Sequence, residues 1–106
     1  MTNPKSSGPI DIKPLGPALK QTQTATLVQT ETFKIVRLIV PAGKEIPSHK
    51  APGEITVQCL EGRVAFSVGE TTHNLEAGQL LHVGSKETHA LRGLEDASLL
   101  VTIALR

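Results

Sequence analysis

The chain has 106 residues, 39% of them hydrophobic and 20% charged, which predicts one folded domain with its own core. Eleven Lys and Arg residues nearly balance ten Asp and Glu residues, so no field of one sign attracts nucleic acid or an anionic membrane. Two Phe, with no Trp or Tyr, argue against a platform that stacks bases, and one cysteine excludes an internal disulfide. With no long apolar run and no evident signal peptide, we expect a cytoplasmic protein without a membrane partner.

Residues 1–20 are predicted to form a proline-rich N-terminal segment that precedes the folded domain, residues 21–106. Four of the seven prolines fall in the first 17 residues. Proline lacks a backbone N–H and fixes φ, so this segment is neither a helix nor a central strand. Only residues 10–13 alternate apolar and polar side chains, and they are interpreted either as one short edge strand or as part of a disordered tail.

The rest of the chain predicts an all-β domain. Residues 22–32 are rich in Thr and Val, which favour strands, and residues 33–40 form a second apolar run that ends at a proline. Regularly spaced glycines then separate short apolar runs, and no sustained helical periodicity is present. This pattern indicates two antiparallel sheets in a sandwich or barrel. The later expected strands are residues 55–60, 63–68, 71–75, 79–83, 89–94 and 97–105.

Alternation within two of these runs predicts which side chains share a face. Residues 55–60 carry partly apolar side chains on both faces, which is typical of a strand in a barrel wall with a ligand cavity on one side. The sets expected to share a face are Ile55, Val57 and Cys59, and Val64, Phe66 and Val68. The single cysteine is expected to pack as a small hydrophobic residue.

Two clusters of glycine and histidine, residues 43–62 and 78–93, carry a recognisable spacing. The matching positions are Gly43, His49 and Gly62 in the first cluster, and Gly78 and His89 in the second. The two clusters resemble the two motifs of the cupin family, and the resemblance extends over about residues 22–105. It implies a single-domain antiparallel jelly-roll β-barrel of the RmlC-like type, with a pocket inside the barrel.

The resemblance also implies a metal site, but the motif is degenerate. Family members that bind metal use two His and a Glu from the first motif and one His from the second. Here Ala51 and Ile55 occupy two of these positions, so only His49 and His89 remain. We therefore expect a metal-poor or metal-free pocket, with one divalent ion (Fe, Mn, Ni or Zn) as the alternative. The candidates for a third ligand are His73, His82, Glu54 and water.

Three functions remain open. The first is a small-molecule binding protein, and the alternative is a metal-dependent cupin enzyme of the dioxygenase, isomerase or decarboxylase type. A purely structural role through oligomerisation is a third reading. The resemblance implies a homodimer that involves the N-terminal segment. The predicted pocket residues are His49, His89, His82, Ile55, Val57, Phe66 and Leu91.

Overall fold

The computed structural model of the protein describes residues 8–106. In this part of the chain it contains nine β-strands and one short 3₁₀-helix, which confirms the prediction of an all-β fold with little helix. The first seven residues of the predicted proline-rich segment lie outside the described residues. No helix in residues 8–106 is long and apolar enough to cross a bilayer. The elements are η1 (Gly16–Gln21), β1 (Ala25–Gln29), β2 (Phe33–Val40), β3 (Glu45–His49), β4 (Ile55–Glu61), β5 (Arg63–Val68), β6 (Thr71–Glu76), β7 (Leu80–Val83), β8 (His89–Gly93) and β9 (Ala97–Ala104).

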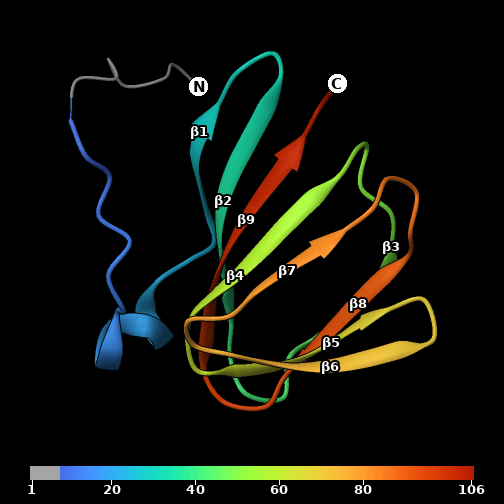
Figure 1. Ribbon diagram of the computed structural model, residues 1–106. Helices are drawn as coiled ribbons and strands as arrows, with labels where there is room; N and C mark the ends of the chain where they lie inside the picture. The colour runs from blue at the N-terminus through green and yellow to red at the C-terminus, as the bar shows by residue number, and fades with distance from the viewer. Residues whose placement is uncertain (1–7) are drawn as a thin grey trace.

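The strands form two antiparallel sheets that face each other (Figure 1). The five-stranded sheet has the order β1-β2-β9-β4-β7, and the four-stranded sheet has the order β3-β8-β5-β6. Neighbours in both sheets are mostly distant in sequence, which confirms the jelly-roll prediction. Among the described residues no hydrogen-bonded ladder joins one sheet to the other. The expected barrel is therefore an open two-layer jelly roll and not a closed cylinder.

One strand, β3, was not predicted from the sequence. It contains Pro47, which cannot donate a backbone hydrogen bond and therefore argues against a central strand. The structure places β3 at the edge of the four-stranded sheet, where it pairs only with β8. The pairing register shifts between Ile46 and His49, as at a β-bulge. A proline is tolerated here because one side of an edge strand has no partner.

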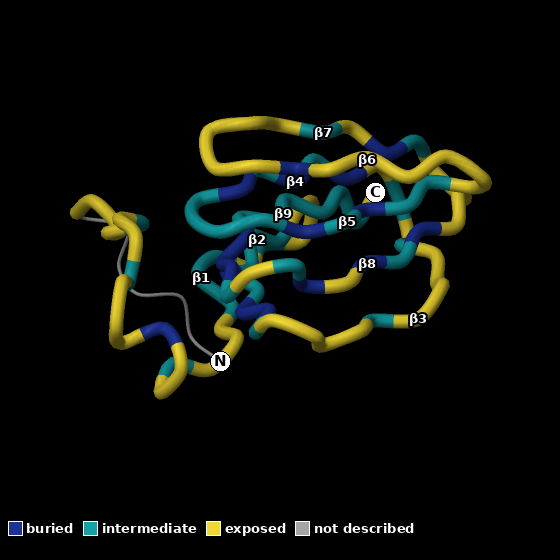
Figure 2. Tube along the Cα trace, turned by 90° about the horizontal axis from the view of Figure 1, so that it is seen from below, coloured by how far each residue is buried: buried dark blue, intermediate teal, exposed yellow. Residues whose placement is uncertain are grey.

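The hydrophobic core lies between the two sheets. The expected face-sharing sets in β4 and β5 point into it, and Cys59 packs there as a fully buried side chain. In Figure 2 the buried positions lie mostly where the sheets face each other, whereas β3 and β6 are largely exposed. The buried core consists of Val40, Ile55, Val57, Cys59, Val64, Phe66, Leu75, Val83, Leu91, Ala97 and Leu99.

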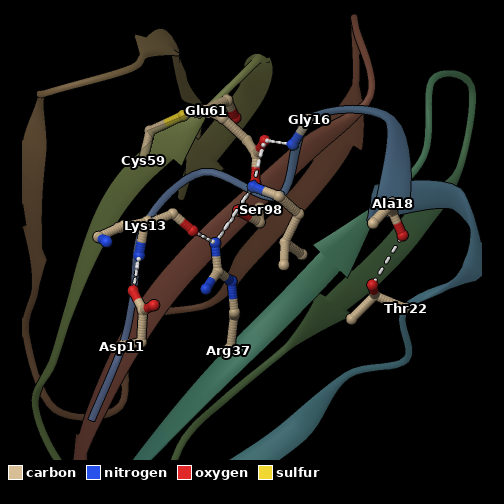
Figure 3. A network of polar contacts seen from close by, with 10 residues as sticks. Asp11, Lys13, Gly16, Ala18, Thr22, Arg37, Cys59, Glu61 and Ser98 are labelled. Atoms are coloured by element: carbon tan, nitrogen blue, oxygen red, sulfur yellow. Dashed lines mark hydrogen bonds and ion pairs between the residues drawn. The ribbon is translucent and has the colours of Figure 1, made fainter. Parts of the chain in front are cut away.

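The N-terminal segment is attached to the five-stranded sheet just before η1. The carboxylate of Glu61 accepts hydrogen bonds from the backbone N–H groups of Leu15 and Gly16, and Arg37 donates to the carbonyl of Lys13 (Figure 3). In η1, Leu19 is buried against the domain. Polar contacts to the sheet and one buried leucine therefore hold this part of the segment in place.

Residues 8–12, here called the N-terminal arm, extend away from the two sheets (Figures 1 and 2). Within the described chain, the residues 10–13 expected as an edge strand pair with no strand. The N–H of Lys13 instead bonds locally to the carboxylate of Asp11. Ile10 is left 45% exposed, so the arm presents an apolar side chain to its surroundings.

Candidate functional site

A cavity of about 270 Å³ opens between the two sheets. Strands β2, β4 and β9 line it on one side, and strands β3, β5 and β8 line it on the other. The strand pairings arrange its lining side chains in two levels, because residues directly opposite each other in an antiparallel ladder point to the same face. Below, the outer level is called the rim and the inner level the wall.

The rim is formed where several strands begin or end. Lys34 near the start of β2 pairs with Ile103 near the end of β9, and Ile103 in turn pairs with Ile55 at the start of β4. On the opposite sheet His49, the last residue of β3, pairs with His89, the first residue of β8. His49 is exposed, so the rim is the end at which the cavity meets solvent. All the polar side chains of the lining belong to this level.

The wall lies one step further in along each strand and is entirely apolar. On the five-stranded sheet, Val101 pairs with Val36 of β2 and Val57 of β4. On the four-stranded sheet, Leu91 pairs with Ile46 of β3 and Phe66 of β5. Leu38 extends the lining beyond this level. A ligand that passed the rim would therefore meet only hydrocarbon. The wall residues are Val36, Ile46, Val57, Phe66, Leu91 and Val101.

The rings of His49 and His89 meet edge to face, with 4.2 Å between their centroids. Nδ1 of His49 lies 2.9 Å from the carbonyl oxygen of Pro47, and Nδ1 of His89 lies 3.3 Å from that of Glu87. A carbonyl can only accept, so in each neutral ring Nδ1 carries the proton and donates. The two Nε2 atoms are then left with free lone pairs, which can accept a hydrogen bond or bind a metal ion.

His89 is the more deeply placed of the two histidines. It is buried, and its ring stacks on that of Phe66 with planes 9° apart and centroids 5.9 Å apart. Burial lowers the pKa of His89, and the nearby His49 lowers it further, while the hydrogen bond to the Glu87 carbonyl acts in the opposite direction. The net shift is downward, so the neutral imidazole is the dominant form of His89 at pH 7.

The structure brings six of the seven predicted pocket residues to this cavity, and His82 is the exception. Leu81 and Val83 of β7 pack against the core, so His82 between them points to the outer face of the sheet. Its Nε2 lies 2.7 Å from Oε1 of Glu54, and both side chains are exposed. The alternation had left the direction of His82 undecided, because β7 is apolar on both faces.

The donor set does not fit the four-ligand metal site that the family motif implies. Ala51 and Ile55 stand at two of the four positions, and Ile55 lines the cavity with a hydrocarbon side chain. The proposed third ligands His73, His82 and Glu54 do not line it. Among residues 8–106 no group of three or more His, Cys, Asp or Glu side chains could hold a metal ion. A metal here would have two protein ligands.

Half of the lining was not predicted from the sequence. The missed residues come mainly from β2 and β9, whose apolar side chains occur on both faces, so alternation alone did not show which face turned inward. Lys34 could have been considered, because it lies on the same face of its strand as the apolar Val36 and Leu38. The missed residues are Lys34, Val36, Leu38, Ile46, Val101 and Ile103.

The two facing sheets and the histidines at the rim of an internal cavity define a small jelly-roll domain. The chain belongs to the cupin family, because the family profile described as "Cupin domain" matches residues 36–103. A search of curated proteins found no significant match.

Several solved structures have the same fold. A conserved protein of unknown function from Streptococcus pyogenes has a TM-score of 0.76 at 24% identity, covering 99% of this chain and 93% of that one. A cupin superfamily protein from Desulfitobacterium hafniense has a TM-score of 0.78 at 15% identity, covering 99% and 97%. An RmlC-like cupin from Methanocaldococcus jannaschii has a TM-score of 0.71 at 19% identity, covering 76% and 77%. At these identities the likeness concerns the fold.

Proposed function

We propose that the protein binds a small, largely apolar molecule in the cavity between its two sheets. The observation that carries this proposal is the division of the cavity into a polar rim and an apolar wall. Ligand pockets are typically apolar concavities in which a few polar groups fix the orientation of the ligand. Protein interiors are close-packed, so an apolar cavity of this size between the sheets favours a binding role.

The size of the cavity limits the ligand. Its volume is about 270 Å³, whereas an apolar cavity of about 150 Å³ is sufficient for benzene. One substituted ring or a branched chain of similar bulk therefore fits between the sheets. Burial of such a ligand against the wall supplies most of the binding free energy, at about 25 cal/mol for each Å² of apolar surface removed from water.

The proposal is tested by blocking the cavity. Val101 points into the cavity, while its neighbour Leu100 on β9 points to the outer face, so Val101→Phe and Leu100→Phe add bulk on opposite sides of one strand. Ligands are first found by NMR screening of a library of small molecules against the full chain. We expect their binding to disappear in Val101→Phe and to persist in Leu100→Phe. Equal binding by both variants would place the ligand outside the cavity and overturn the proposal.

The alternative is a metal-dependent cupin enzyme, and one observation favours it. The free Nε2 atoms of His49 and His89 belong to touching rings at the rim of the cavity, where an ion would be accessible to a ligand. Elemental analysis of protein purified without a histidine tag decides between the two. One equivalent of Fe, Mn, Ni or Zn per chain, lost in His89→Leu, would favour the enzyme. Ligand binding that persists after treatment with a chelator would favour the binding protein.

A further inference from the structure

The rim of the cavity carries an unbalanced positive charge. In the described part of the chain, Lys34 is the one side chain with a full charge that lines the cavity, and no Asp or Glu lines it. Among residues 8–106 the ammonium group of Lys34 forms no salt bridge. A lysine beside an apolar cavity with no carboxylate partner is a ready site for the anionic group of a ligand.

The two histidines at the rim offer a different kind of group. Their Nδ1 atoms face backbone carbonyls, so the neutral rings present Nε2 lone pairs that accept hydrogen bonds. A hydroxyl group on the ligand can donate a hydrogen bond to these Nε2 atoms. A second anionic oxygen on the ligand would be repelled by their lone pairs. The rim thus combines one ammonium donor with two imidazole Nε2 atoms.

We propose that the ligand is a small hydroxy acid with an apolar body. Its carboxylate lies beside Lys34, its hydroxyl donates to Nε2 of His49 or His89, and its body occupies the apolar wall. A single ammonium group matches one negative charge better than the two charges of a phosphate monoester. This inference rests on the proposed binding function and adds the chemical class of the ligand.

Four probes separate the contributions of the ligand groups. Mandelate carries a carboxylate, a neighbouring hydroxyl and a phenyl ring. Phenylacetate lacks the hydroxyl, 1-phenyl-1,2-ethanediol lacks the carboxylate, and lactate lacks the ring. Dissociation constants for the full chain are measured by NMR titration at low ionic strength. We expect mandelate to bind at least about tenfold more tightly than each of the other three probes, since each lacks one charge-assisted, hydrogen-bonded or apolar contact.

A substitution of Lys34 then tests the role of the charge. Lys34→Met keeps a long flexible side chain and removes the ammonium group. We expect it to weaken binding of mandelate and phenylacetate by about tenfold and to leave binding of the diol unchanged. The matched control is Lys44→Met, because Lys44 is exposed beyond the other end of β2 and does not line the cavity. The control variant should bind all four probes like the unmodified chain.

The outcomes separate this inference from the proposed function. If the diol binds as tightly as mandelate, or if Lys34→Met weakens both equally, the hydroxy-acid assignment is wrong while the cavity remains a binding site. Suppose that none of the four probes binds but screening finds another ligand whose binding is abolished by Val101→Phe. The hydroxy-acid assignment then fails, while the proposed binding function stands. If no molecule of any class binds in the cavity, both proposals fail. Added salt should weaken binding of mandelate and leave that of the diol unchanged.

Discussion

Arg37 and Glu61 form an ion pair across the five-stranded sheet, with 3.4 Å between Nη2 and Oε2 and only 8% and 14% of their side chains exposed. The hydroxyl of Ser98 donates to the same carboxylate at 2.6 Å. The backbone N–H groups of Leu15 and Gly16 complete the set of donors. One carboxylate therefore joins the N-terminal segment to strands β2, β4 and β9.

Replacing this carboxylate by its neutral isostere should destabilise the fold. We expect Glu61→Gln to lower the free energy of unfolding by about 2–4 kcal/mol, because a buried guanidinium loses its partner and charge-assisted hydrogen bonds become neutral ones. Urea denaturation measures the change. The matched control is Glu95→Gln, which removes the exposed pair between Arg63 and Glu95 and should cost less than about 0.5 kcal/mol. Similar losses in the two variants would contradict this account.

The same carboxylate predicts a pH dependence of stability. Burial raises the pKa of Glu61, but the hydrogen bonds from Leu15, Ser98 and Gly16 and the charge of Arg37 outweigh it and lower the net pKa. In the unfolded chain the Glu61 carboxylate takes up a proton at about pH 4.3, whereas in the folded chain it is still ionised at that pH. The stabilisation is thus complete above that pH and decreases as the pH falls toward the folded pKa.

We expect the difference in unfolding free energy between the unmodified chain and Glu61→Gln to shrink between pH 6 and pH 3. Urea midpoints at several pH values give this difference directly. A difference that stays constant over the whole range would show that the folded and unfolded pKa values of Glu61 are equal.

The histidine tautomers at the rim are a third prediction. His89 should be neutral at pH 7.5 with its proton on Nδ1, because its pKa is lowered and the Glu87 carbonyl accepts that proton. The neutral ring of His49 should adopt the same tautomer, because of its contact with the Pro47 carbonyl. Long-range proton–nitrogen correlation spectra distinguish the two tautomers. A proton on Nε2 of either ring would remove one of the two acceptors invoked for the ligand hydroxyl.

Gly62 is a fourth test, because it joins β4 to β5 in a conformation that needs glycine. Its φ is +77°, and an added Cβ would collide with the carbonyl oxygen of Asp96 and lie 2.7 Å from Cα of Ala97. We expect Gly62→Ala to cost more than about 3 kcal/mol in urea denaturation. Gly69→Ala is the control, with φ at +58° and open space around the added Cβ. It should cost only about 1–2 kcal/mol, the penalty of the left-handed conformation. Equal losses would mean that the contact with Asp96 is relieved by a small shift.

The N-terminal arm leads to a prediction about assembly. We propose that the chain forms a homodimer in which the arm packs against the partner, since residues 8–12 extend away from their own sheets with Ile10 exposed. Light scattering at high micromolar concentration should give about twice 11.3 kDa. Ile10→Asp should shift the mass toward the monomer. Leu80→Asp, on the exposed outer face of β7, is the comparison variant and should remain dimeric. A monomeric unmodified chain would contradict the proposal, and a dimer broken only by Leu80→Asp would place the interface on the sheet.

The periodicity of the sequence determined the fold class and, in two central strands, which side chains share a face. Alternation placed Ile55 and Val57 on one face of their strand and Phe66 on the same face as Val64 and Val68, because side chains two residues apart must share a face. The resemblance of the two glycine and histidine motifs to those of the cupin family implied that His49 and His89 would meet. Only the sharing of a face depends on local geometry, which a short stretch of sequence specifies, whereas His49 and His89 lie on strands that the fold brings together.

The tertiary structure alone decided the features that depend on strand pairing. Strand β2 is apolar on both faces, so only its pairing with β9 showed that Lys34 shares a level with Ile103 at the rim. In the same way, packing of β7 beside β4 turned His82 outward. Alternation states which residues lie together on one face. Which face becomes the inside depends on neighbours that are distant in sequence, and the folded topology brings those neighbours together.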